Sequence, residues 1–191
     1  IEVEANLELI RDLTTRMGKI TGQHKKSARK SPAELRPTSV STVIADAVFL
    51  MGQRFREAHT DLDTSDVPSD MHAYCDANRL EQVFVNLFGN ALDSMAQSET
   101  RVVTVSARED GPVVRIAVRD RGAGIAPEHL PRLFEPFFTT KEQGAGLGLG
   151  LAISAGIVRE FGGTLKARNH PDGGAEFVIQ LRSATIEESA D

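Results

Sequence analysis

Two asparagine residues, Asn86 and Asn90, lie four positions apart in a stretch whose apolar side chains recur at helical spacing. Gln82 precedes them by one turn and Asp93 follows, so amide and carboxylate groups form one polar stripe beside an apolar face. Asparagine is a poor helix former, so two of them within one helix cost stability. An amide oxygen is a suitable ligand for a hard cation such as Mg²⁺. The stripe is therefore either a solvated helix face or part of a magnesium site.

A second candidate follows the segment Val113–Arg119, which is expected to form a strand. The next six residues are Asp120, Arg121, Gly122, Ala123, Gly124 and Ile125. The two glycines allow the backbone to turn sharply or to approach a ligand closely. A carboxylate at a strand end can accept a hydrogen bond from the exocyclic amino group of adenine, whereas guanine presents a carbonyl oxygen there. Asp120 therefore favours adenine, although Asp-x-Gly at a strand exit is by itself a common sequence.

A third candidate is a run of alternating glycines that continues into a helical pattern. Backbone N–H groups in such a run, together with the N-terminus of the following helix, can bind phosphate. The run lacks the Gly-Lys-Ser/Thr of a P-loop and the βαβ context of a dinucleotide-binding loop. A flexible linker is the alternative, but a linker would not continue directly into Leu-Ala-Ile at helical spacing. The residues concerned are Gly144, Gly146, Leu147, Gly148 and Gly150.

The segment before the glycines, Phe134–Lys141, places aromatic side chains beside two hydroxyl groups and a cation. Exposed aromatic residues in a mobile loop are typical of a lid that closes over a ligand. The side chains expected to face such a ligand are Phe138, Thr139, Thr140 and Lys141.

Blocks of helix and of strand are predicted to position these groups. Helices are expected over Val40–Phe55, from an Asp76 N-cap to about Ala96, and over Leu147–Phe161. Strands are expected at Thr60–Asp63, Met71–Cys75, Val102–Ala107, Val113–Arg119, Thr164–Arg168 and Ala175–Leu181. This order predicts an α+β fold: a two-layer α/β sandwich in which a mixed, mostly antiparallel sheet has helices on one face.

The N-terminal residues predict a separate long helix. A seam of positions at spacings of three and four runs from Val3 to Ser27, mostly apolar but with polar residues towards both ends, and Ser31-Pro32 ends the pattern. A single helix cannot bury such a seam, so it needs partner helices. We expect residues 1–30 to be one helix of an incomplete hairpin, 31–37 a linker, 38–183 the main domain and 184–191 an acidic tail.

Composition limits the classes of function. The net charge of −5 over 191 residues argues against nucleic-acid binding. No apolar run approaches the roughly 20 residues that a membrane helix needs, so no membrane contact is expected from this chain. The single cysteine, Cys75, is expected to be a buried residue on a strand in a reducing compartment. Because the sequence opens with Ile, we expect a fragment of a longer cytoplasmic protein, with any inner-membrane anchor outside this sequence.

Taken in order, the asparagine stripe, the Asp120 loop, the Phe134 segment and the glycine run resemble the four nucleotide-binding boxes of sensor histidine kinases, within the GHKL superfamily. The resemblance covers roughly Thr38 to Arg182. It implies ATP and Mg²⁺ as cofactors, with Asn90 as the metal ligand and Asn86 and Lys141 as catalytic residues. The implied cofactor-binding residues are Asn86, Asn90, Asp93, Asp120, Gly122, Gly124, Ile125, Phe138, Thr139, Thr140, Lys141, Gly144, Gly146, Leu147, Gly148 and Gly150.

The same resemblance implies the reaction and the partners. Residues 1–30 resemble the second helix of a dimerisation and phosphotransfer hairpin, so the full-length protein is expected to be a homodimer. The γ-phosphoryl group of ATP would pass to a histidine on that hairpin and then to the receiver domain of a response regulator. Thr15–Thr21 and Phe137–Lys141 look most like the nitrogen-regulation and dicarboxylate-sensing branch.

Two features depart from the family pattern. Asp93 stands where many members carry a basic residue, so a phosphate contact from that position is not implied. The acceptor histidine of the family is followed by an acidic residue, and none of the five histidines here has that context. We therefore expect this chain to bind nucleotide without phosphorylating itself.

Two alternatives remain open. A GHKL-type ATP hydrolase would carry a glutamate at the position of Asn86 to activate water, and an asparagine cannot act as that base. A non-catalytic nucleotide-sensing scaffold would need no complete site, whereas all four boxes are intact here.

Overall fold

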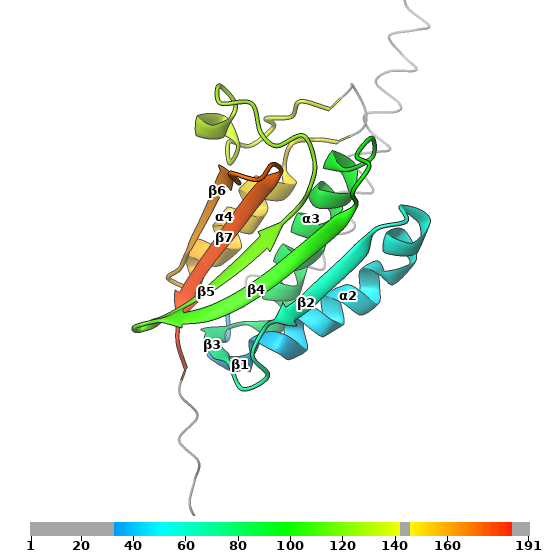
Figure 1. Ribbon diagram of the computed structural model, residues 1–191. Coiled ribbons are helices and arrows are strands. Elements are labelled where there is room, and N and C mark those ends of the chain that lie inside the picture. The colour runs from blue at the N-terminus through cyan, green and yellow to red at the C-terminus, as the bar shows by residue number, and fades with distance from the viewer. Residues whose placement is uncertain (1–32, 142–145, 185–191) are drawn as a thin grey trace, which may run out of the picture. The chain divides into compact units, whose positions relative to one another are not determined.

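The computed structural model describes residues 33–141 and 146–184. The predicted helix at 1–30, the start of the predicted linker, nearly all of the acidic tail and Gly144 lie outside the described residues. The described part has an α+β fold, as the sequence predicts (Figure 1).

The main sheet has five strands in the order β2-β4-β5-β7-β6. β2 pairs with β4 in parallel and every other pairing is antiparallel, so the sheet is mixed but mostly antiparallel. The strands are β2 (Asp61–Asp66), β4 (Val102–Asp110), β5 (Val113–Arg119), β7 (Ala175–Arg182) and β6 (Thr164–Asn169). Each overlaps a strand expected from the sequence.

Among residues 33–141 and 146–184, the helices α2 (Val40–Glu57), α3 (Ala77–Ser94) and α4 (Gly150–Glu160) cover one face of this sheet, and no other described element covers its opposite face (Figure 1). Of these helices, α3 packs against both α2 and α4. Alternate residues of β5, namely Val114, Ile116 and Val118, are buried under the helices. The alternation of side chains along the strand therefore determines which face of the sheet packs against the core.

The helix starts follow from local hydrogen bonding. The carboxylate of Asp76 accepts a hydrogen bond from the backbone N–H of Arg79 at 3.2 Å, which confirms Asp76 as the N-cap of α3. The last helix begins at Gly150 rather than at Leu147, because Gly148 has a positive φ of 66° that a helix cannot include.

A small second sheet was not expected from the sequence. β1 (Arg36–Ser39) pairs antiparallel with β3 (His72–Cys75), so Arg36 and Pro37 form part of a strand although the sequence placed them in a linker. A strand of this length that contains proline gives almost no periodic signal. Cys75 on β3 is fully buried, and burial raises the pKa of its thiol to about 11.

None of the helices within residues 33–141 and 146–184 combines the length and the apolar character that crossing a bilayer requires.

Candidate functional site

Asp120, at the exit of β5, is a buried carboxylate with a defined orientation. Its side chain is 3% exposed. The backbone N–H of Gly122 donates to its Oδ1 at 2.8 Å and the N–H of Ala175 donates to the same atom at 3.2 Å. These bonds fix the carboxyl group and leave Oδ2 as the second acceptor. Burial raises the pKa of Asp120, while hydrogen bonds from Gly122, Ala175 and Ser94 act in the opposite direction.

The loop after Asp120 lies against the C-terminal end of α3. A Cβ added to Gly122 would lie 2.5 Å from Ser94 Oγ and 2.8 Å from Ser94 O, so only glycine fits there. Gly124 has a positive φ of 77°. Gly122 therefore allows the close approach of the loop to the end of α3, and Gly124 provides the sharp turn of its backbone.

The turn between β6 and β7 holds the same loop from its other side. The side chain of Asn169 donates from Nδ2 to Ile125 O and accepts at Oδ1 from Ile125 N, both at 2.7 Å. Gly174 has a positive φ of 80°, and a side chain there would clash with the carbonyl of Asp120. The sequence predicts the strands on either side of this segment but not its contact with the Asp120 loop, for which the pair Gly173-Gly174 was the available signal.

The asparagine stripe of α3 faces the start of α4. Asn86 Nδ2 donates to Ser154 Oγ at 2.9 Å, and Ser154 is 1% exposed. A side chain at Gly150 would clash with the amide of Asn86, so this glycine allows α4 to begin against α3. Asn90, one turn later, is half-buried. The end of α3, the exit of β5 and the start of α4 thus meet at one end of the sheet (Figure 1).

Asp93 lies in the last turn of α3 between two cations. Lys141 Nζ from the lid segment lies 2.5 Å from its Oδ2, and Arg54 Nη2 from α2 lies 3.4 Å from its Oδ1. Sequence reasoning named Asp93 and Lys141 separately and missed both their pairing and Arg54. Arg54 lies outside every motif, so the sequence carried no signal for it.

The lid segment is closed at its base by one backbone hydrogen bond. Phe137 N donates to Gly148 O at 3.0 Å, and Phe137 itself has a positive φ of 67° and is 73% exposed. Phe138 instead packs beside His129, with a ring separation of 5.4 Å, and under the guanidinium of Arg132 at 4.7 Å. The other expected lid residues are exposed: Thr139, Thr140, Lys141, Gly146 and Leu147.

The donor set fits a magnesium ion bound mainly through ATP. Within the described part of the chain, no group of three or more His, Cys, Asp or Glu side chains is placed to hold a metal ion. Mg²⁺ takes few protein ligands and shares the rest with water and phosphate oxygens. A half-buried amide such as that of Asn90 fits that requirement.

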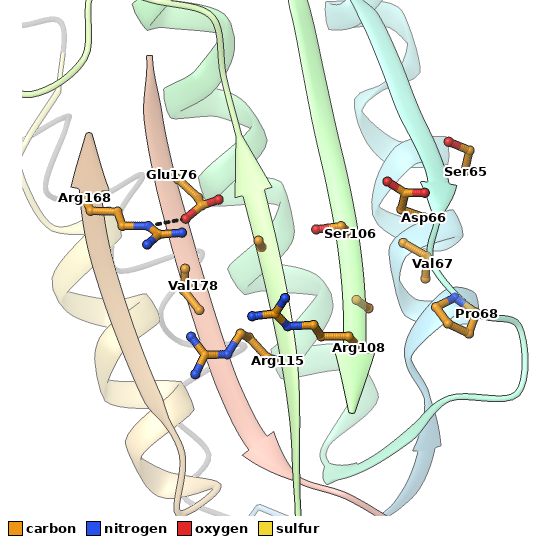
Figure 2. A pocket seen from close by; sticks show the side chains of 12 residues that line it. Ser65, Asp66, Val67, Pro68, Ser106, Arg108, Arg115, Arg168, Glu176 and Val178 are labelled. Carbon is orange, nitrogen blue, oxygen red and sulfur yellow. Dashed lines mark hydrogen bonds and ion pairs between the residues drawn. The ribbon is translucent and has the colours of Figure 1, made fainter. Parts of the chain in front are cut away.

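A separate groove of about 610 Å³ lies on the open face of the sheet. Figure 2 shows Arg108, Arg115 and Arg168 around it, with Arg168 paired to Glu176. Most of its lining residues lie on the sheet face that the helices do not cover, and none of them belongs to the candidate site.

Comparisons with known proteins agree with this geometry. The family model described as histidine kinase-, DNA gyrase B- and HSP90-like ATPase matches residues 75–185. The C4-dicarboxylate transport sensor protein DctB of Rhizobium meliloti (strain 1021) is 39% identical over 180 residues, which are 94% of this chain and 28% of DctB. The dicarboxylate-sensing similarity expected from the sequence is thus present in a named relative.

Two solved structures have the same fold at the residues compared. The catalytic domain of the histidine kinase ThkA is 28% identical with a TM-score of 0.68, over 78% of this chain and 95% of that one. Full-length ShkA in complex with AMPPNP is 31% identical with a TM-score of 0.66, over 79% of this chain and 31% of that one.

The chain therefore belongs to the histidine kinase-, DNA gyrase B- and HSP90-like ATPase family, and within it to the ATP-binding catalytic domains of sensor histidine kinases. It spans less than a third of the length of DctB, at 28%.

Proposed function

We propose that this chain binds Mg²⁺-ATP and transfers the γ-phosphoryl group to a histidine on a dimerisation hairpin, from which a response-regulator receiver domain takes it. Likeness to DctB, a sensor protein, and to the catalytic domain of a histidine kinase supports this proposal. ShkA was solved with AMPPNP, an ATP analogue, which supports the choice of nucleotide.

The observation that carries the proposal is the environment of Asn86. Its amide donates to Ser154 and lies against the start of α4. An amide at this position cannot remove a proton from water, so the arrangement favours phosphoryl transfer to a protein nucleophile over hydrolysis. Phosphoryl transfer needs mainly positioning and charge neutralisation, and the residues of this site provide both.

Each residue then has one role. Asp120 Oδ2 accepts from the adenine amino group, while the Gly122–Ile125 loop forms the wall of the base pocket. Asn90 holds Mg²⁺, which when bound would neutralise part of the triphosphate charge. Lys141 and the backbone N–H groups of Gly146–Gly150 contact the phosphates, and the lid opens to release ADP.

Phosphohistidine formation tests this proposal. The chain would be mixed with a separate hairpin that carries an acceptor histidine, and γ-labelled ATP would be added. The expected product is an acid-labile, base-stable label on the hairpin, absent when the acceptor is replaced by glutamine. Steady-state phosphate release without a labelled hairpin would favour a hydrolase. ATP binding with neither product would favour a nucleotide-sensing scaffold.

A further inference from the structure

The negative charge of the Asp93 carboxylate opposes phosphate binding at the proposed site. It lies less than one turn beyond Asn90, the proposed magnesium ligand, on the same stripe of α3. ATP brings several negative charges to this end of the site, and a carboxylate without a cation beside it would repel them. An Asp93 that stays negative therefore needs a permanent positive partner.

The lid cannot supply a permanent partner. Lys141 Nζ pairs with Asp93 Oδ2 at 2.5 Å. If Lys141 contacts phosphate when ATP binds, it must leave Asp93 at the moment when the local negative charge is greatest. The second cation has to come from an element that does not move with the lid.

Arg54 meets that requirement. It lies in the last turn of α2, which packs directly against α3. Its Nη2 lies 3.4 Å from Asp93 Oδ1, and a Cβ added to Gly89 would lie 3.3 Å from its Nη1. Because Gly89 has no side chain, the guanidinium of Arg54 can lie against the surface of α3 one turn before Asp93.

This pair is not explained by stability. The Arg54 and Asp93 side chains are 51% and 44% exposed. Ion pairs with that exposure contribute little to folding, because water and salt screen them. The pair lies beside the candidate site, where it can affect ligand binding.

We infer that Arg54 is a positioning residue for the phosphate end of the site. It acts through Asp93: the guanidinium neutralises and holds the carboxylate, so that Lys141 can move to the phosphates without leaving an uncompensated charge behind. This inference rests on the proposed function, because it assumes that Asn90 and Lys141 mark the triphosphate end.

A double-mutant cycle tests the inference. The affinity for Mg²⁺-ATP would be measured by titration calorimetry at low salt for wild type, Arg54→Gln, Asp93→Asn and the double variant. Arg54→Gln is expected to weaken binding about 5- to 10-fold, with a smaller effect at high salt. In the Asp93→Asn background the same change is expected to alter affinity by less than about twofold.

Arg56→Gln is the matched control. Arg56 lies in the same turn of α2 and is exposed, so the change removes the same charge at a similar place. It is expected to leave affinity within about twofold of wild type, and the unfolding temperatures of both variants should agree. Arg54→Lys should restore part of the affinity.

Two outcomes would overturn the inference. Equal affinities for the Arg54 and Arg56 variants would remove the role of Arg54. An equal loss with and without Asp93 would show that Arg54 does not act through that carboxylate. Failure of the wild-type chain to bind ATP would instead reject the proposed function, so the two failures are distinguishable.

Discussion

Asn169 and Ile125 are joined by two reciprocal hydrogen bonds, in which the side-chain amide of Asn169 satisfies both the N–H and the carbonyl of Ile125 at 2.7 Å. The residues are far apart in sequence, on β6 and on the loop that follows β5. The side-chain amide of Asn169 thus forms the two hydrogen bonds with the Ile125 backbone that a neighbouring strand would otherwise form. The conformation of this loop, which we propose forms the wall of the base pocket, is therefore held from the far edge of the sheet.

Replacing Asn169 should weaken ATP binding more than it weakens the fold. Asn169→Ala removes both hydrogen bonds, and we expect about a tenfold loss of affinity, in line with about 1–1.5 kcal/mol for such bonds. Asn169 is exposed, so the unfolding temperature should change by only a few degrees. Lys166→Ala, an exposed change on the same strand, is the control for both measurements. Unchanged affinity in Asn169→Ala would show that the loop holds its shape without this contact.

Replacing Asp120 by asparagine should separate adenine recognition from folding. The Oδ1 of an asparagine can still accept from Gly122 and Ala175, but its Nδ2 would face the adenine amino group donor to donor. We expect ATP affinity to fall on the order of 100-fold while the chain stays folded. Asp110→Asn, at the distant end of β4, is the control with the same change in charge. Wild-type affinity in Asp120→Asn would reject the assignment of the base pocket.

The free energy of unfolding should depend on pH through the ionisation of Asp120. Burial raises the pKa of Asp120 above its ordinary value of 3.8, so the folded chain holds this proton more tightly than the unfolded chain. Ionisation then lowers the free energy of unfolding as the pH rises from 3.8 through the folded pKa. Relative to Asp120→Asn, the wild type should lose stability over that window and level off above it. The measurement is the denaturant midpoint of both proteins at a series of pH values. If the pKa of Asp120 were not raised, the difference between wild type and Asp120→Asn would stay constant over this window.

Asn90 should account for the effect of magnesium. Its side chain is half-buried at the end of the stripe, and Asn90→Ala removes the proposed ligand without removing a charge. Wild-type affinity for ATP should be higher with Mg²⁺ than with a chelator, and this ratio should fall to about one in the variant. Gln82→Ala, two turns earlier on the same helix, should keep the wild-type ratio. A ratio unaffected by Asn90→Ala would place the metal ligand elsewhere.

Two glycines in the same region should respond oppositely to alanine. Gly148 has a φ of 66° and a Cβ there would lie 2.6 Å from the carbonyl carbon of Phe137. Gly148→Ala should therefore cost at least about 1–2 kcal/mol of local stability and weaken ATP binding. Gly156 lies within α4 with open space around a new Cβ, so Gly156→Ala should stabilise by about 0.5–1 kcal/mol. Thermal unfolding and calorimetry on both variants check the two signs.

The sequence predicts the parts of this fold that depend on local pattern. Val113–Arg119 is a strand as expected, and Asp76 caps α3 as expected, because alternation and capping involve neighbouring residues. β1 escapes prediction because it is stabilised by pairing with β3, a partner distant in the sequence. The early start assigned to α4 has a different cause, since leucines among the glycines continue the helical pattern while Gly148 cannot be helical.

The site shows the same division. Motif residues such as Asp120 and Asn86 are recognisable because their types and spacing suit a chemistry. Asn169, Ser154 and Arg54 are recognisable only in three dimensions, because each acts on a residue far away in the chain. The sequence does not identify the side chains that orient the chemical groups, because those side chains lie on elements without a recognisable motif.

The hydrogen bond from Phe137 N to Gly148 O joins the chain on the two sides of the proposed lid. Residues inserted or deleted between these two positions would not change the distance between the sheet and α4. Doubling such a segment costs only about 0.6 kcal/mol in closure entropy. The proposed lid is thus a region where a change of length should be tolerated, and where a designer could exchange one sequence for another, while the proposed base pocket and the asparagine stripe remain in place.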